Sequence, residues 1–328
     1  PEEIYKASDR LLESVKDIRQ TDIATIKESR KDDYIYRQYS DIERQGIRFT
    51  YPGHINYPDK LLNIYDYPYI LYYKGKLPDT DKPSVAIVGA RNCTEYGRMV
   101  AQHFGESFAG MGLQVISGMA LGIDAAAQKG AIKNGGYSLA VLGCGVDICY
   151  PRTNIELYTH LNDCGGIISE YPPGTAPRAG LFPMRNRIIS AMADALVVVE
   201  ARQKSGSLIT VKHALEQGVD VCAVPGRIND VLSGGCNRLI QEGAFPATST
   251  LDILFSMGID MKKNEKTKIF LEKQNEVLYS VLDLQPQTPD EIMQKTGMNR
   301  GAVYEGLLWL LMHGLAEEPV KNYYIRKE

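Results

Sequence analysis

The sequence predicts an α/β fold: a doubly wound, Rossmann-like parallel sheet, with a small helical region before it and a winged-helix domain after it. Three observations predict the sheet. Short apolar runs recur between residues 84 and 224, stretches with helical spacing separate them, and the connections are short and rich in glycine. Continuous apolar strands that alternate with helices form a parallel sheet covered on both faces. Right-handed crossovers make such a sheet doubly wound.

The first 48 residues are charged and carry apolar residues at helical spacing, including Leu11, Leu12 and Val15, so we expect short helices there. The next segment, residues 49–83, crowds tyrosine and proline into "YPGHINYPDKLLNIYDYPYILYYKGKLP" and predicts an irregular, partly extended chain. The simplest interpretation of so much tyrosine is an apron packed on the following domain. A surface on which nucleobases stack is the alternative.

The main domain is placed at residues 49–258. A helix is expected from about Thr94, directly after the first apolar strand. The apolar runs place six strands, at 84–88, 113–117, 138–142, 166–169, 195–200 and 219–224.

Residues 259–328 differ in composition from the main domain. Residues 259–268, "IDMKKNEKTK", are polar and rich in lysine and predict a linker. Residues 269–328 then show a helix near 270–283, a shorter one at 289–295, a third through "GAVYEGLLWLLMHG" and a tail typical of a β hairpin. Three helices and a hairpin predict a winged helix.

The third of these helices is poor in basic residues. "NRGAVYEGLLWLLMHG" carries one Arg and one Glu, whereas a reader of duplex DNA normally places several basic residues against phosphates. Docking to a protein, or to the main domain, is therefore as good an interpretation as DNA binding. The apolar residues expected in its core are Leu307, Leu308, Trp309 and Leu311.

Composition excludes several classes of protein. The net charge of −3 argues against a protein coated in positive charge, so any nucleic-acid site must be a local patch. Six cysteines without a CxxC pair predict neither a zinc site nor a disulfide framework. No apolar stretch reaches membrane-spanning length and the start lacks a signal-peptide core. We expect a cytoplasmic protein that holds no metal and does not bind a membrane.

Basic residues gather in the turns that follow the strands. Because parallel strands end at the same edge of a sheet, these turns converge. They hold nine of the 13 Lys and Arg residues between positions 84 and 257: Arg91, Arg152, Arg178, Arg185, Arg187, Arg202, Lys204, Arg227 and Arg238.

The first of these turns, Gly89-Ala90-Arg91, departs from a dinucleotide fingerprint. Such a fingerprint would have glycine at position 91 and again near Thr94, and a ribose-binding acid about 20 residues further on. A dinucleotide-dependent oxidoreductase is therefore rejected, and no cofactor is expected.

Other turns favour anion binding. Ser117 and Gly118 precede one helix, and Ser205, Gly206 and Ser207 open another. Helix N-termini with small hydroxyl residues bind anions, and arginine supplies forked donors that fit phosphate oxygens. Several such sites along one edge suit a polyanion. Asp124 is expected to compensate a helix dipole, and Glu170 and Glu200 are expected to pair with arginines of these turns.

The motifs resemble those of the DNA-processing protein A (DprA/Smf) family. The resemblance runs from about Tyr57 to Met257. It rests on "AIVGARNCTEYG", "ISGMALGIDAAAQKGAI", "AVLGCGVDICYPR", "SEYPPGTAPRAGLFPMRNRIIS", "EARQKSGSLITVKHALEQGVDVCAVPG" and "SGGCNRLIQEGA".

The resemblance implies a Rossmann-like domain that binds single-stranded DNA without catalysis, helps to load the recombinase RecA during natural transformation, and forms a homodimer. The residues it implies for DNA contact, together with those of the anion-binding turns, are Gly89, Ala90, Arg91, Ser117, Gly118, Arg152, Arg178, Arg185, Asn186, Arg187, Lys204, Ser205, Gly206 and Ser207.

Two features depart from the family pattern. Ala90 stands where the family often has Ser or Thr, so one hydroxyl donor is lost. Residues 1–48 lack the Gly-x-Gly hairpin of a helix-hairpin-helix start, so we expect this SAM-like region to be either truncated or divergent.

An enzyme is the competing interpretation. Related Rossmann-like proteins cleave nucleotide monophosphates at the glycosidic bond, which requires a carboxylate at the sugar. Their turn carries a glutamate on the following helix, where this chain has Val211, Lys212 and His213.

Overall fold

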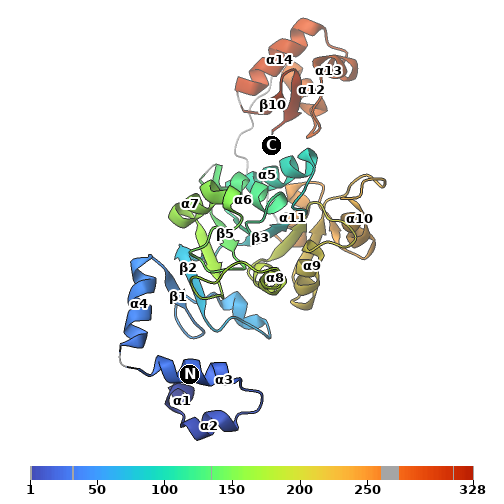
Figure 1. Ribbon diagram of the computed structural model, residues 1–328. Coiled ribbons are helices and arrows are strands. Elements are labelled where there is room, and N and C mark those ends of the chain that lie inside the picture. Colours follow the sequence, from blue (N-terminus) through green and yellow to red (C-terminus); the bar gives the residue numbers. More distant parts are fainter. Residues whose placement is uncertain (1, 32, 134, 260–272, 313, 328) are drawn as a thin grey trace. The chain divides into compact units, whose positions relative to one another are not determined.

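The structure of the protein is a computed structural model that describes residues 2–31, 33–133, 135–259, 273–312 and 314–327. The chain divides into two compact units, Pro1–Asp260 and Met261–Glu328 (Figure 1). Apart from Ile259, the predicted linker at 259–268 lies outside the described residues.

The first unit is built on a nine-stranded sheet with the order β1-β2-β6-β5-β4-β3-β7-β8-β9. Its strands are β1 (Arg48–Thr50), β2 (Leu71–Gly75), β3 (Ser84–Val88), β4 (Gln114–Ser117), β5 (Ser138–Val141), β6 (Gly166–Ser169), β7 (Ala195–Val198), β8 (Asp220–Ala223) and β9 (Phe245–Pro246).

The strands from β3 to β9 pair in parallel, which confirms the predicted Rossmann-like sheet. All six predicted strands form, within one or two residues of their expected ends. From β3 the chain first builds β4, β5 and β6 on one side, and then crosses back to place β7 on the other side of β3. The strand order therefore reverses between β3 and β7.

The tyrosine-rich segment is more regular than its sequence predicts. β1 and β2 form an antiparallel pair, and β2 extends the sheet by pairing antiparallel to β6. A short 3₁₀ helix, η1 (Asp59–Asn63), precedes β2. Tyr57, Leu61 and Leu71 are buried against the main core, so this segment is in part the packed apron that we expected. In β2, the buried Leu71 and Tyr73 alternate with a less buried residue, which is the pattern of a strand with one face on the core.

Helices cover both faces of the sheet (Figure 1). They are α5 (Glu95–Gly110), α6 (Ile123–Lys133), α7 (Ile155–Cys164), α8 (Leu181–Ala191), α9 (Ser207–Glu216), α10 (Gly234–Gln241) and α11 (Thr250–Ser256), with the 3₁₀ helix η2 (Arg152–Asn154) before α7. α8, α9 and η1 pack on one face, where Ile188 and Val211 join the main core. α6 and α7 pack on the other, around Ala125 and Leu157.

The N-terminal region is helical, as its pattern predicts. The helices are α1 (Glu2–Lys6), α2 (Asp9–Ser14), α3 (Gln20–Ser29) and α4 (Tyr34–Arg44). Leu12 and Ile23 are its fully buried apolar residues among those described. Ile47 joins the core around α7 and ties the end of this region to the sheet.

The second unit contains the expected three helices and hairpin, and its identity as a winged helix stays a prediction. The elements are α12 (Lys273–Val281), α13 (Pro289–Thr296), α14 (Arg300–Met312) and the pair β10 (Ala316–Val320) and β11 (Tyr323–Arg326). Leu307 and Leu310 are buried in its core, but Leu308 is exposed, so that core assignment was wrong. A helix turns by 100° per residue, which places position 308 on the opposite side from 310.

Close packing of α5 against α6 gives a test of this arrangement. A Cβ added to Gly105 would collide with the carbonyl oxygen of Ala127, whereas one added to Gly110, in the same helix, meets open space. Gly105→Ala should therefore lower the free energy of unfolding by about 2 kcal/mol, and Gly110→Ala should raise it by about 0.5 kcal/mol. Urea unfolding followed by circular dichroism measures both. Equal effects of the two substitutions would contradict the helix packing.

Candidate nucleic-acid interface

A pocket of about 600 Å³ opens at the point where the strand order reverses. It is called the strand-end pocket here, and it lies beyond the carboxyl ends of β3 and β7. Its lining includes Gly89 and Arg91 from the turn after β3 and Lys204 to Ser207 from the turn after β7. Open α/β sheets bind ligands at such reversal points because the two crossovers leave in opposite directions and separate there.

The turn after β3 is held by its neighbours. The Ala90 amide donates to the Glu200 carbonyl oxygen at 2.8 Å, and the Ala90 carbonyl accepts from Ile123 at 3.2 Å. Gly122 has φ +76°, and any Cβ there would collide with the Ala90 and Arg91 carbonyl oxygens. Glycine is therefore required at position 122, because it permits both this backbone angle and the close approach of the two turns.

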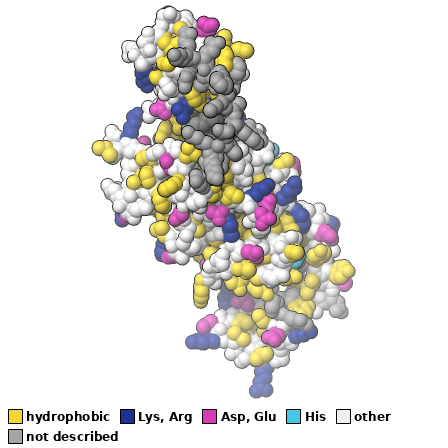
Figure 2. All heavy atoms as spheres, turned by 180° about the vertical axis from the view of Figure 1, so that it is seen from behind, with side chains coloured by type: hydrophobic (Ala, Val, Ile, Leu, Met, Phe, Trp, Pro, Cys, Tyr) yellow, Lys and Arg dark blue, Asp and Glu magenta, His cyan; other side chains and the backbone are white. Residues whose placement is uncertain are grey.

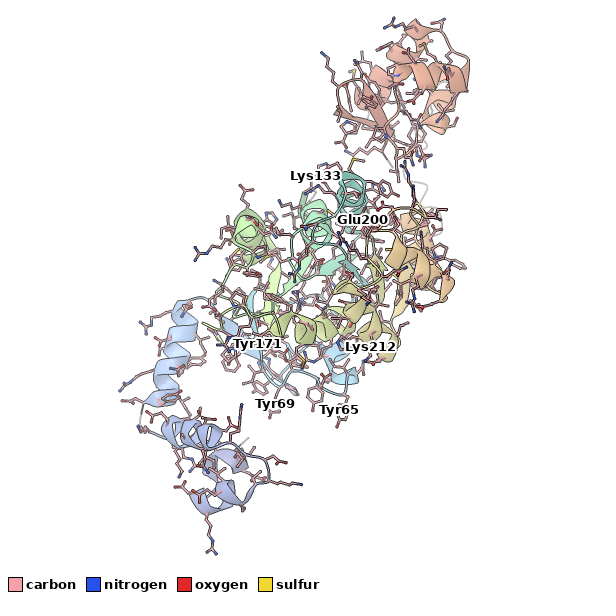
Figure 3. All side chains as sticks on the ribbon, turned by 45° about the vertical axis from the view of Figure 1, so that its right-hand side comes forward. Tyr65, Tyr69, Lys133, Tyr171, Glu200 and Lys212 are labelled. Carbon is pink, nitrogen blue, oxygen red and sulfur yellow. The ribbon has the colours of Figure 1, made fainter. Side chains whose placement is uncertain are left out.

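Glu200 performs a different task from the predicted one. Its carboxylate accepts from the Thr94 amide at 2.9 Å and from the Thr94 hydroxyl at 2.5 Å, and Thr94 in turn caps α5 by accepting from Gly97. The expected pairing of Glu200 with an arginine was wrong, because the helix that begins at Glu95 brings unpaired N–H groups next to this carboxylate. Glu200, labelled in Figure 3, is 4% exposed.

The N-terminus of α9 faces the strand-end pocket with small polar residues. Ser205 and Ser207 bond to each other through their hydroxyl groups at 2.8 Å, and Gly206 is exposed between them. All three line the pocket, as does the exposed Lys204. The positive end of a helix dipole, small hydroxyl residues and a lysine together suit an anion such as phosphate.

Two aromatic rings stand beside this anion site. Tyr150 and Phe182 stack with ring centroids 5.4 Å apart and an interplanar angle of 26°. The Arg91 guanidinium lies over the Phe182 ring at 5.5 Å. The pocket thus joins a basic group to an aromatic surface, a combination suited to nucleobases and phosphates together.

Sequence reasoning missed these two rings as binding residues. Tyr150 precedes Pro151 and Phe182 precedes Pro183 in the quoted motifs, but neither motif by itself assigns its ring a role. The two rings are far apart in the sequence, so no local pattern predicts that they stack.

Two buried ionisable residues of opposite charge line the pocket. Arg185, which is 4% exposed, donates through Nη1 to the Gly118 carbonyl at 2.9 Å and also to the Val141 carbonyl. Asp124, which is likewise buried, accepts from the Gly118 amide at 3.1 Å. Burial raises the pKa of Asp124 and lowers that of Arg185, and the opposite charge of each partner acts against both shifts.

The loop predicted to carry Arg185, Asn186 and Arg187 is a helix at those positions. α8 begins at Leu181 and turns the three side chains in different directions. Asn186 lines the strand-end pocket and donates to the Gly206 carbonyl at 3.4 Å. Arg187 lies outside that lining and is 6% exposed.

Arg187 binds two carboxylates instead of facing the pocket. Its Nη1 and Nη2 donate to Glu170 at 2.9 and 2.6 Å, and its Nε donates to Asp66 at 2.7 Å. The predicted pairing of Glu170 with an arginine is therefore confirmed. Burial alone lowers the pKa of Arg187, but the Glu170 and Asp66 carboxylates outweigh it and hold that pKa above its ordinary value.

The structure brings eight of the predicted residues into one pocket lining and leaves the others outside it. Those in the lining are Gly89, Arg91, Arg185, Asn186, Lys204, Ser205, Gly206 and Ser207. Those outside are Ala90, Ser117, Gly118, Arg152, Arg178 and Arg187. Ser117 is buried and donates to the Ile87 carbonyl at 2.6 Å, whereas Arg152 and Arg178 are exposed.

The positive charge of the pocket is local. Among the described residues, neither Arg91 nor Lys204 forms an ion pair. Elsewhere basic and acidic side chains are interspersed, as Figure 2 shows for the face that it presents. Both side chains can therefore bind an anionic ligand in the pocket.

Comparison with known proteins decides the family. The family described as DNA recombination-mediator protein A matches residues 48–258. The chain belongs to the DNA-processing protein A (DprA/Smf) family. DNA processing protein DprA of Streptococcus pneumoniae is 44% identical over 60% of this chain and 70% of its own length. DprA of Bacillus subtilis is 41% identical, over 64% of this chain and 71% of its own length.

Solved structures of DprA proteins confirm the fold. The X-ray structure of DprA from S. pneumoniae is 38% identical in sequence and has a TM-score of 0.59. The match covers 73% of this chain and 87% of that structure's chain. A structure of DNA processing protein A from Helicobacter pylori, reported for its single-stranded DNA binding mode, is 28% identical with a TM-score of 0.58. The match covers 66% of this chain and 98% of that structure's chain.

No helix among the described residues has the length and apolar character that crossing a membrane requires. No group of three or more His, Cys, Asp and Glu residues in the part of the chain that the structure describes is arranged to hold a metal ion.

Removal of one carboxylate tests the Arg187 cluster, which consists of Arg187, Glu170 and Asp66. Glu170→Gln should lower the free energy of unfolding by about 2 kcal/mol, because a buried guanidinium then keeps a single anionic partner. Glu242→Gln is the matched control, since Glu242 also binds an arginine (Arg238, 2.8 Å) but both side chains are more than half exposed. Glu242→Gln should lower the free energy of unfolding by less than about 1 kcal/mol. Chemical denaturation measures both, and equal costs would show that Glu170 is not part of a buried cluster.

Proposed function

We propose that this protein binds single-stranded DNA without catalysis and acts in DNA processing during natural transformation, where it helps to load RecA. We further propose that it works as a homodimer in the cytoplasm. The observation that carries the proposal is the strand-end pocket, in which Arg91 lies over the Phe182 ring beside the open N-terminus of α9.

The geometry supports single strands over duplex. Aromatic rings accept bases only when the bases are unpaired, whereas a duplex hides its base faces by stacking. The Tyr150–Phe182 stack offers such a surface, and Arg91 and Lys204 supply charge for adjacent phosphates. The name of the H. pylori relative, which refers to single-stranded DNA binding, supports the same ligand.

An enzyme that cleaves nucleotide monophosphates is the second candidate, and one observation favours it. Asp124 lines the pocket, and burial raises the pKa of its carboxyl group, as a general acid would require. Against this role, Asp124 is engaged with the Gly118 amide, while Glu170 and Glu200 are engaged with Arg187 and Thr94. Release of free base that disappears in Asp124→Asn would replace our proposal with the enzyme.

A titration with labelled oligo-dT and the matching duplex tests the proposal. The wild type should prefer oligo-dT, and Arg91→Ala should weaken this binding strongly. The plot of log affinity against log salt should flatten by about 0.7, the value for one phosphate released on a single strand. Arg91→Lys should restore part of the affinity, because an ammonium lacks the planar fork.

Thermal unfolding is the control for Arg91. The side chain is exposed, so the melting temperature of Arg91→Ala should equal or slightly exceed that of the wild type. An Arg91→Ala protein that binds oligo-dT normally but unfolds several degrees earlier would make the arginine structural.

The role of the second unit is tested by truncation. A chain that ends at Asp260 keeps the whole strand-end pocket, so its affinity for oligo-dT should stay within a few-fold of the full-length value. The same titration measures it. A soluble truncated protein that no longer binds would place the main DNA site in the second unit.

A further inference from the structure

The segment Tyr65–Tyr69, here called the tyrosine segment, exposes three aromatic rings that the strand-end pocket does not use. Tyr65 is fully exposed, Tyr69 is 54% exposed and Tyr67 is 41% exposed. Figure 3 shows Tyr65 and Tyr69 projecting away from the ribbon of the first unit. Burial explains Tyr57 and Tyr73 in the same part of the chain, but it does not explain these rings.

The tyrosine segment is held in place although its rings are free of the core. The Tyr57 hydroxyl donates to the Pro68 carbonyl at 2.6 Å, and Pro68 itself is buried. Leu61 and Leu71, on either side of the segment, are completely buried. A fixed backbone presents the rings with little loss of conformational entropy when a ligand binds.

Arg187 joins this segment to the helix that carries the pocket residues. It binds Asp66, between Tyr65 and Tyr67, and also Glu170, which precedes Tyr171. The same helix, α8, supplies Phe182, Arg185 and Asn186 to the pocket. The Tyr171 hydroxyl donates to the Leu181 carbonyl at 3.4 Å, so Tyr171 lies at the start of that helix.

The contact between Arg187 and Asp66 also reduces an electrostatic obstacle. Asp66 is the only acid within the segment, and a free carboxylate there would repel phosphates. Its bond to the Arg187 guanidinium weakens that repulsion in part, because Arg187 shares its single positive charge between Asp66 and Glu170.

We infer that the tyrosine segment is a second contact surface for single-stranded nucleic acid, on which bases of a strand stack after it leaves the strand-end pocket. This inference rests on the proposed function and extends its site. Tyr65 and Tyr69 supply the stacking faces. Arg187 is a positioning residue, which explains why a basic residue of this motif binds carboxylates instead of the ligand.

Strand length and salt separate this surface from the pocket. The double variant Tyr65→Ala/Tyr69→Ala should bind an oligo-dT of about 20 nucleotides at least about fivefold more weakly per lost stack, and an oligo-dT of about six nucleotides as the wild type does. The salt slope should not change, because a ring neutralises no phosphate. Arg91→Ala should weaken both oligonucleotides and flatten the slope.

Matched variants identify the interaction as stacking. Tyr65→Phe/Tyr69→Phe should keep the affinity for the long strand, whereas Tyr65→Leu/Tyr69→Leu should lose it, since leucine is apolar but has no ring face. Tyr36→Ala is the control for loss of an exposed tyrosine elsewhere, because Tyr36 is 78% exposed on α4. Its affinity should equal that of the wild type. Unchanged melting temperatures will show that every variant is folded.

Three results would overturn the inference. Long-strand affinity that survives the alanine pair would show that the rings do not contact the strand, while the proposed function would stand. Full affinity of the leucine pair would replace stacking by a general apolar contact with the strand. A wild type that binds neither oligonucleotide would remove the proposed function and this inference together.

Discussion

The parallel pairing of β3 with β7 is the constraint on which the site depends. It aligns Val85 with Ala195 and Val88 with Val198, so that both strands end at the same level of the sheet. The turn with Arg91 and the turn with Lys204 thereby become neighbours although more than a hundred residues separate them in the sequence. Because the crossovers on either side run in opposite directions, the space beyond these strand ends stays open as a pocket.

Buried charges then divide the basic residues into two kinds. Arg185 and Arg187 are withdrawn from solvent and compensated by carbonyl groups and carboxylates, because an uncompensated buried charge is strongly destabilising. Arg91 and Lys204 stay exposed, and among the described residues no ion pair occupies them. A guanidinium fork fits a carboxylate as well as it fits a phosphate. The surroundings alone decide which partner an arginine takes.

The aromatic residues show the same division. Tyr57 and Tyr73 strengthen the core beside the sheet, whereas Tyr65 and Tyr69 stand outside it on a backbone that the buried residues hold. Tyr150 and Phe182 meet only because the turn after β5 lies next to the start of α8. Rings of one chemical type therefore serve packing or recognition according to which side of the backbone faces the core.

The sequence by itself determined the sheet, its covering helices and the gathering of basic turns at one edge, because apolar periodicity and glycine turns are local properties. It also contained the motifs of the DprA/Smf family. Only the tertiary structure decided that β2 extends the sheet, that α8 begins before Arg185, and that Glu200 binds Thr94, the cap of α5, while Glu170 binds Arg187. Those outcomes depend on contacts between distant segments. A carboxylate or a guanidinium takes whichever partner the packed chain brings within reach once water is excluded, and no local pattern encodes that choice.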